Sequence, residues 1–178
     1  MRWLSTCLAT LVVGFSLPAP ASAELVDQRG VRFTPSAQSD PIVLTFVATR
    51  CTDACPIANA VFSSAVARAT SAGVRGTFVT ATLDPMHDTP LVMAEYARRL
   101  GADPRRWRFV SGSEHDVVAL MQRFGVVAVR TDHTSWIYVS RYRAGKDRAV
   151  QTLFLSNDAA ERILEILKAE SVKSNHHA

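Results

Sequence analysis

Two cysteines four residues apart, Cys51 and Cys55, are the side chains of this sequence best suited to chemistry, and Pro56 follows the second directly. Their spacing is one residue longer than that of the common Cys-x-x-Cys redox motif. Thiolates are soft ligands that suit Cu(I), and two of them leave Zn(II) short of its usual four ligands. The pair therefore predicts either a metal site completed by a ligand from elsewhere in the fold or a dithiol that cycles with its disulfide.

A permanent structural disulfide is another interpretation of the same pair. We disfavour it, because cross-linking so short a loop gives little entropic stabilisation. Cys55 also stands at the expected start of a helix. The partial positive charge of a helix N-terminus lowers the pKa of a thiol and makes it more nucleophilic. We therefore expect a lowered pKa for Cys55 and a reactive pair.

Five histidines could supply a further metal ligand. His87 lies in a loop after the second predicted central strand, at the same sheet end as the cysteines, and His133 immediately precedes a later strand. His115 falls in the first turn of a predicted helix between two acidic residues and is most simply a solvated surface residue. His176 and His177 belong to a polar C-terminal tail, and we assign them no role. Spacing alone does not choose between His87 and His133.

Strand-like and helix-like segments alternate along the chain around these residues. Short apolar, β-rich runs predict strands, and apolar residues at helical spacing after a capping residue predict helices. The predicted strands are 42–47, 74–83, 107–112, 135–140 and 149–155. The predicted helices begin at Pro56, Thr89-Pro90, Ser113 and Asp158, and the first two end at Gly73 and Gly101.

This order of elements predicts an α/β fold, a three-layer sandwich with a mixed central β-sheet. Helical crossovers of this length suit parallel strands, whereas the short link between the last two strands suits an antiparallel pair. The cysteine pair then lies at the C-terminal end of the first central strand, 42–47. Open α/β sheets place their ligand sites at this end.

The first 23 residues are typical of a cleavable export signal. A short positively charged start precedes an uncharged, mostly apolar run at 4–17, and residues 21–23 form the small-x-small pattern that signal peptidase accepts. The run is shorter than the roughly 20 residues of a membrane-spanning helix, although an uncleaved anchor is an open alternative. We therefore expect a periplasmic or otherwise exported protein, with one domain at 24–170, a disordered tail at 171–178, and a membrane contact only if the signal is uncleaved.

The chain is mildly basic, with 20 lysine and arginine residues against 16 acidic ones. This excess is not gathered into one block, and its densest part, 98–108, is most simply a solvated helix end and loop. No nucleic-acid reader motif is present, and exported proteins seldom meet nucleic acid. We therefore expect no nucleic-acid partner.

Four segments, in their order and spacing, resemble the SCO/SenC family: TFVATRCTDACP, TLDPMHDTP, YARRLGADPRRWRFVSG and DHTSWIYV. The resemblance covers about residues 24–167 and implies a thioredoxin-like fold. It also implies that copper, as Cu(I) or Cu(II), is bound through Cys51, Cys55 and His133. Family members serve assembly of the binuclear copper centre of cytochrome c oxidase. The resemblance thus implies a metallochaperone whose partner is a copper-receiving protein such as an oxidase subunit.

Other residues match or depart from the family pattern. Asp84 and Asp88 match it, and we expect them to shape the loop facing the site. Thr52 stands where relatives often have proline, and 139–150 lacks the usual Asp-Pro-x-Gly turn. Many relatives keep a membrane anchor at the N-terminus, whereas the segment here looks cleavable.

Two other functions stay open for the cysteine pair. A thiol-disulfide oxidoreductase would use Cys51 and Cys55 as its redox pair to keep the cysteines of cuproproteins reduced. A peroxidase is suggested by the pattern Thr-x-x-Cys-Pro at Thr52, which also occurs in peroxiredoxins. Those proteins carry a proline four residues before the threonine, where this chain has Ala48. We rank the metallochaperone first, the oxidoreductase second and the peroxidase third.

Overall fold

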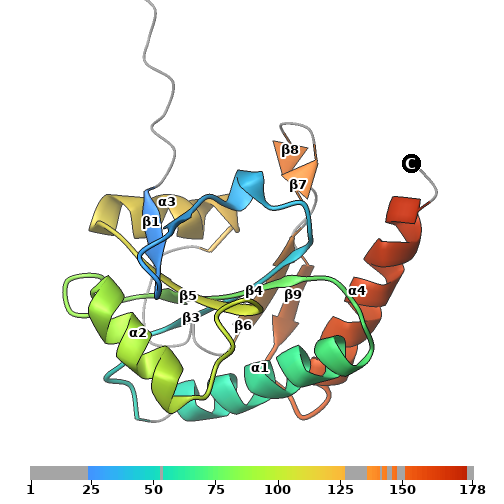
Figure 1. Ribbon diagram of the computed structural model, residues 1–178, viewed down its shortest axis with the longest axis horizontal. Coiled ribbons are helices and arrows are strands. Elements are labelled where there is room, and N and C mark those ends of the chain that lie inside the picture. Colours follow the sequence, from blue (N-terminus) through green and yellow to red (C-terminus); the bar gives the residue numbers. More distant parts are fainter. Residues whose placement is uncertain are drawn as a thin grey trace, which may run out of the picture.

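The framework of the protein is a seven-stranded mixed β-sheet with helices on both faces (Figure 1). The computed structural model describes residues 24–52, 54–126, 136–140, 142–143, 146–147 and 151–175. The strands are β1 (Leu25–Asp27), β2 (Arg32–Phe33), β3 (Ile42–Val47), β4 (Thr77–Thr82), β5 (Trp107–Ser111), β6 (Trp136–Ser140), β7 (Tyr142–Arg143), β8 (Lys146–Asp147) and β9 (Gln151–Phe154). The helices are the 3-10 turn η1 (Pro35–Ala37) and α1 (Ala54–Ser71), α2 (Pro90–Arg99), α3 (Glu114–Arg123) and α4 (Ala159–Asn175).

The strand order β2-β1-β5-β4-β3-β6-β9 places β3 and β4 inside the sheet. β3 pairs in parallel with β4, and β4 with β5, because helical crossovers return the chain to the same sheet end. β6 is antiparallel to β3 and to β9. Between β6 and β9, the chain adds the small two-stranded sheet of β7 and β8. The predicted mixed sheet and its late antiparallel pair are confirmed.

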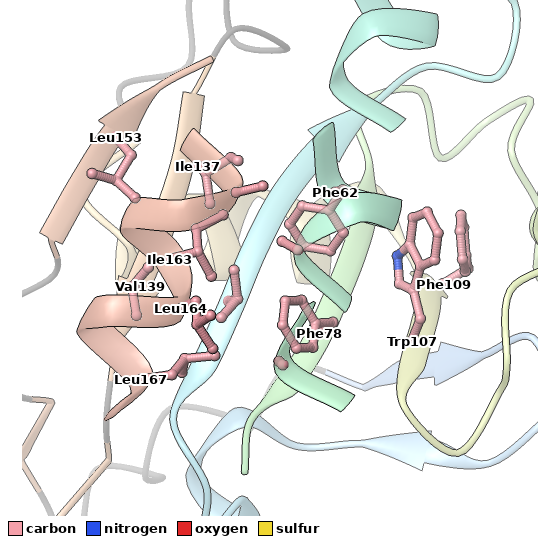
Figure 2. Packing of buried hydrophobic residues seen from close by; sticks show 14 of the residues in the cluster. Phe62, Phe78, Trp107, Phe109, Ile137, Val139, Leu153, Ile163, Leu164 and Leu167 are labelled. Atoms are coloured by element: carbon pink, nitrogen blue, oxygen red, sulfur yellow. The ribbon is translucent and has the colours of Figure 1, made fainter. Parts of the chain in front are cut away.

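Helices α1, α2 and α4 cover one face of the sheet, and α3 covers the other (Figure 1). The larger core lies under α1 and α4. Phe62 of α1 is fully buried there, with its ring centroid 5.6 Å from that of Phe78 in β4 and 5.5 Å from that of Trp107 in β5 (Figure 2). Figure 2 also shows residues of α4 at this core: Ile163, Leu164 and Leu167. The predicted three-layer sandwich is confirmed.

Helices α2 and α3 begin at the capping residues that the sequence predicts, whereas α1 begins at Ala54, two residues before Pro56. The hydroxyl of Thr89 accepts a hydrogen bond from the backbone N–H three residues on, at 3.4 Å, and a proline follows as the first residue of α2. The hydroxyl of Ser113 caps α3 in the same way at 3.1 Å. The chain leaves α1 and α2 through Gly73 and Gly101, each with a φ of 64°. This left-handed conformation favours glycine.

The hairpin of β1 and β2 has no counterpart among the predicted elements. Its strands have only three and two residues, too few for an alternating pattern to appear in the sequence. Tertiary contacts hold it instead. β1 pairs with β5, and the fully buried carboxylate of Asp27 lies 2.9 Å from the guanidinium groups of Arg29 and Arg108. A buried charge is tolerated when it is paired in this way.

Helix α4 extends further than the sequence predicts. Residues 171–175, expected to form part of a disordered tail, continue the helix to Asn175. No proline or glycine interrupts α4, and lengthening an existing helix costs far less than nucleating one. The hydroxyl of Ser171 also donates to the carbonyl of Leu167 at 2.9 Å. The expectation of disorder is therefore corrected for 171–175, while the rest of the tail lies outside the described residues.

No helix in the described part of the chain is long and apolar enough to cross a membrane. The predicted signal at 1–23 lies outside that part. Cleavage of the signal and the domain bounds 24–170 stay predictions.

Candidate metal and thiol site

Two loops meet at the C-terminal ends of β3 and β4. We name them the cysteine loop, residues 48–52, and the aspartate loop, residues 83–89. Val47 and Thr82 are paired at the ends of these strands, and the N–H of Leu83 donates to the carbonyl of Val47 at 2.7 Å. Because both are parallel strands of an open α/β sheet, this edge is where a ligand site is expected.

Cys51 lies in the cysteine loop, and Cys55 lies in the first turn of α1. The N–H of Cys51 donates to the carbonyl of Ala48 at 3.0 Å, which turns the chain before the helix begins. Cys51 is partly exposed, whereas Cys55 is fully buried. Neither cysteine is in a disulfide bond, and the two thiols make a side-chain hydrogen bond with each other. The two sulfurs are therefore close enough to bind one ion or to join in one disulfide.

Burial raises the pKa of the Cys55 thiol to about 12. The hydrogen bond with Cys51 and the negative charge of Asp88 act in the same direction, and a backbone hydrogen bond with Ala48 opposes them. The prediction of a lowered pKa was therefore wrong. The charge of a helix N-terminus contributes about 0.3–1 kcal/mol, too little here to offset the removal of a thiolate from water. Cys55 keeps its proton at neutral pH unless a metal ion displaces it.

Asp88 joins the aspartate loop to the cysteine loop. Its fully buried carboxylate accepts hydrogen bonds from the N–H of Thr49 at 3.0 Å, from the hydroxyl of Thr49, and from the hydroxyl of Thr82 at 2.8 Å. Its carbonyl accepts from the hydroxyl of Ser111 in β5. A buried carboxylate is tolerated when donors satisfy its oxygens. These contacts therefore fix the backbone two residues before Cys51.

A second contact joins the two loops at the surface. The guanidinium of Arg50 lies 2.6 Å from the carboxylate of Asp84, with side chains 65% and 31% exposed. An exposed ion pair of this kind contributes about 0–1 kcal/mol. The N–H of Asp84 also donates to the hydroxyl of Thr82 at 2.8 Å. Asp84 and Asp88 thus shape the loop beside the cysteines, as the sequence predicts.

Replacing Asp88 with asparagine is expected to lower the free energy of unfolding by about 2 kcal/mol. One oxygen that accepts hydrogen bonds becomes an amide nitrogen that can only donate, so buried donors lose their acceptor. Urea unfolding followed by circular dichroism measures the change. Asp103→Asn is the matched control, because the Asp103 side chain is 49% exposed, and it should change the free energy by less than about 0.5 kcal/mol. Equal losses in the two variants would show that Asp88 does not anchor the loops.

Two of the five histidines, His87 and His115, are among the described residues. His87 is exposed in the aspartate loop, and its N–H donates to the carbonyl of Asp84 at 3.0 Å. His115 is 78% exposed beside Asp116, in agreement with a solvated surface residue. His133, His176 and His177 lie outside the described residues. The predicted third ligand therefore stays a prediction.

The potential metal ligands among the described residues suit Cu(I) better than zinc. No group of three or more His, Cys, Asp and Glu side chains within these residues could hold a metal ion. The two adjoining thiols of Cys51 and Cys55 are soft donors, which suit Cu(I) and fall short of a closed zinc site. A third ligand would come from outside the described residues.

A buried polar contact with no counterpart among the predicted site residues begins one helical turn after Cys55. Asn59 is almost fully buried in α1, and its amide nitrogen donates to the hydroxyl of Tyr96 in α2 at 2.6 Å. Burial raises the pKa of Tyr96, and the charges of Cys55 and Cys51 act in the same direction. The hydroxyl therefore lies within electrostatic reach of the thiols. The signal in the sequence is a polar residue one helical turn after Cys55, on the face that α1 buries.

A model of the SCO1/SenC family matches residues 20–171 of the chain. In structure, the chain is similar to yeast Sco1, with a TM-score of 0.67, 21% sequence identity, and coverage of 82% of this chain and 91% of that one. It is also similar to Arabidopsis thaliana ScoI with copper bound, with a TM-score of 0.65, 20% identity, and coverage of 81% and 92%.

A third similar structure is that of BsSco, described as a member of the Sco family of cytochrome c oxidase assembly proteins with a disulfide switch. Its TM-score is 0.67 at 15% identity, with coverage of 81% of this chain and 88% of that one. A sequence search of curated proteins found no match. At these identities the structural similarity shows the fold, and the predicted thioredoxin-like fold is confirmed.

Proposed function

This chain belongs to the SCO1/SenC family, and from this premise we propose that it is an exported metallochaperone. It binds one copper ion through Cys51, Cys55 and His133 and passes the ion to a copper-receiving protein such as a subunit of cytochrome c oxidase. The observation that supports the proposal is the hydrogen bond between two reduced thiols. They lie at the C-terminal ends of the central strands, where open α/β sheets place their ligand sites. Because the protein delivers the copper ion to another protein, it must release the ion as well as bind it.

The chemistry of the thiol pair supports copper in particular. Cu(I) prefers soft sulfur ligands, and an imidazole also suits Cu(II). Cys55 is buried and holds its proton in the metal-free protein, so binding of the ion releases that proton. Cys51 is partly exposed, which gives a receiving thiol or imidazole a sulfur to approach. Transfer is then a stepwise exchange of ligands.

The similar structures support the same proposal. One is of Arabidopsis thaliana ScoI with copper bound. BsSco is described as a member of the Sco family of cytochrome c oxidase assembly proteins. We extend copper binding, and assembly of an oxidase, from those proteins to this chain as part of the proposal.

A thiol-disulfide oxidoreductase is the second candidate, and the contact between the thiols favours it as well. Cys51, the more exposed thiol, would lose its proton and attack a disulfide in a target cuproprotein, releasing one target thiol. Cys55 would then lose its proton and attack the sulfur of Cys51 in the mixed disulfide, releasing the second target thiol. Two electrons move to the target, and this chain keeps the disulfide. The raised pKa of Cys55 slows the second attack at neutral pH.

Two assays on the reduced protein test the proposal and separate it from the second candidate. In the first, the protein competes with bicinchoninate for Cu(I), and we expect one tightly held ion per chain. In the second, the protein catalyses reduction of insulin by dithiothreitol, and we expect little acceleration over the uncatalysed rate. Strong acceleration without tight copper binding would overturn the metallochaperone in favour of the oxidoreductase.

Export is tested by the mass of the mature protein. The small-x-small pattern at 21–23 predicts cleavage before Glu24. We expect the intact mass of the protein recovered from the exported fraction to match residues 24–178. A mass that includes residues 1–23 would show an uncleaved segment instead.

A further inference from the structure

The first residue that the structure describes, Glu24, lies beside the start of helix α3 (Figure 1). β1 pairs with β5 in an antiparallel register that, continued along both strands, places Glu24 opposite Ser113, the residue that caps α3. A Cβ atom added to Gly112 would lie 3.1 Å from the carbonyl oxygen of Glu24 and 3.4 Å from the Cβ of Asp116. The backbone of Glu24 and the side chain of Asp116 are therefore neighbours.

A hydrogen bond joins these two residues. The N–H of Glu24 donates to the carboxylate of Asp116, and the hydroxyl of Ser113 donates to the same carboxylate at 2.6 Å. The side chain of Asp116 is only 16% exposed. The hydrogen bond from Ser113 lowers the pKa of Asp116, and the bonds from Glu24 and His115 act in the same direction against the effect of burial. The carboxylate is therefore ionised at neutral pH.

The partners of this carboxylate leave room for a stronger donor. The hydroxyl and N–H of Ser113 and the N–H of Glu24 are all neutral. The imidazole of His115 lies 3.5 Å away and is 78% exposed, so it contributes little. The side chain of Glu24 turns to β2 instead, where its carboxylate lies 2.9 Å from the guanidinium of Arg32. The backbone nitrogen of Glu24 is thus the group that faces Asp116 from β1.

We propose that Asp116 binds the α-ammonium group of the mature protein. Hydrolysis of the bond between Ala23 and Glu24 leaves a carboxylate on Ala23 and an amino group on Glu24, with water supplying the oxygen and the hydrogen. At neutral pH this amino group takes up a proton, because its ordinary pKa is about 8. The neutral donor becomes a charged one, and hydrogen bonds between charged partners are about twice as strong. The inference rests on the cleavage proposed above.

The consequence is that removal of the export signal strengthens the fold. In the precursor the nitrogen of Glu24 is a neutral amide, so the ion pair with Asp116 does not exist. The positive end of the α3 dipole opposes a cation at this place, but Glu114 and Asp116 in the first turn of α3 offset it, and the carboxylate of Asp116 accepts directly from the nitrogen. Cleavage therefore completes the contacts that hold β1 against α3.

The test compares two metal-free, reduced chains released from a fusion protein, one starting at Glu24 and one at Ala21. In the longer chain the Glu24 nitrogen is a neutral amide. Its own ammonium group can lie up to about 10 Å away, a full screening length at 0.1 M salt. We expect the equilibrium constant of unfolding at pH 7, from urea titration, to be about tenfold smaller for the chain that starts at Glu24, which corresponds to a rise of about one unit in the pKa of its amino group.

Asp116→Asn, introduced into both chains, should reduce this difference to less than about twofold, because asparagine accepts a hydrogen bond but carries no charge. Comparison within the variant pair cancels any loss of helix capping. Glu114→Gln is the matched control, since Glu114 is an exposed acid of the same helical turn, and it should leave the difference in place. Equal stability of the two parental chains, or an undiminished difference with Asp116→Asn, overturns the inference.

The dependence on pH gives a second test that needs no substitution. The pair raises the pKa of the α-ammonium group, so its stabilisation is complete below the unfolded value, about 8, and is lost as pH rises through the folded value, about 9. The tenfold difference should therefore vanish by about pH 10.5, and a difference that persists there contradicts the assignment. The other charged or titratable groups on the surrounding elements are shared by both chains: Glu114, His115 and Asp116 of α3, Arg32 of β2, the Asp27–Arg108 pair and the carboxylate of Glu24.

These measurements separate failure of the inference from failure of the proposed function. They need no copper, so a protein that binds none is tested equally well. If the exported protein keeps residues 1–23, the proposed processing fails, and the two prepared chains still decide whether Asp116 binds the amine.

Discussion

Replacing either Cys51 or Cys55 with serine should lower the affinity for Cu(I) by more than about 100-fold. Mutating a residue that only hydrogen-bonds to a metal ligand typically lowers metal affinity by about 10–100-fold. Removing a ligand itself should cost more, because the serine hydroxyl that replaces the thiol is a hard donor that suits Cu(I) poorly. The measurement is competition with bicinchoninate on the reduced variants. Cys55→Ser also places a hydroxyl at a fully buried position, so circular dichroism must first show that this variant is folded.

Met86→Ser is the matched control for the cysteine variants. Met86 carries a sulfur in the aspartate loop, and its side chain is 84% exposed. It should lose no affinity if the binding site is the thiol pair. Parental affinity in either cysteine variant, or a loss in Met86→Ser as large as in Cys55→Ser, would contradict the ligand assignment.

Replacing His133 with alanine should affect the two oxidation states of copper differently. Two thiolates still hold Cu(I), so that ion should stay bound. Cu(II) binding should weaken strongly, and its charge-transfer absorption should change, because imidazole is the ligand that suits Cu(II). Titration with each ion, followed by absorption, measures both effects.

The control for His133 is His87→Ala, because His87 is exposed in the aspartate loop beside the cysteines. It should bind both oxidation states as the parent does. If His133→Ala bound both like the parent and His87→Ala did not, the third ligand would be His87. This comparison decides between the two histidines that the spacing of the sequence left open.

The parts of the fold that follow from local signals were predictable from the sequence. The strand Ile42–Val47 is apolar apart from Thr45 and is buried along its whole length. Thr89 and Ser113 cap helices by their own side chains, and a glycine follows the end of α1 at Gly73. Such signals act within a few residues, so they can be identified without knowledge of the tertiary structure.

Other features depend on contacts between distant residues and could not be predicted in this way. β1 is fixed by pairing with β5 and by the contact of Asp27 with Arg108. At the site, helix position alone predicts an acidic Cys55 thiol, whereas burial by the rest of the fold raises the pKa of that thiol instead. The hydrogen bond between Asn59 and Tyr96 joins two helices. The sequence indicates that Asn59 is a polar residue on the buried face of its helix, but it does not indicate that Tyr96 is its partner.

The most direct test of the central claim is the ligand shell of copper in the loaded protein. X-ray absorption at the copper edge of the Cu(I) form, prepared with one ion per chain, counts the atoms bound to the metal and tells sulfur from nitrogen. We predict two sulfurs and one nitrogen per copper, from Cys51, Cys55 and His133. A shell made only of nitrogen and oxygen, with no sulfur, would contradict the assignment of the thiol pair as the copper site.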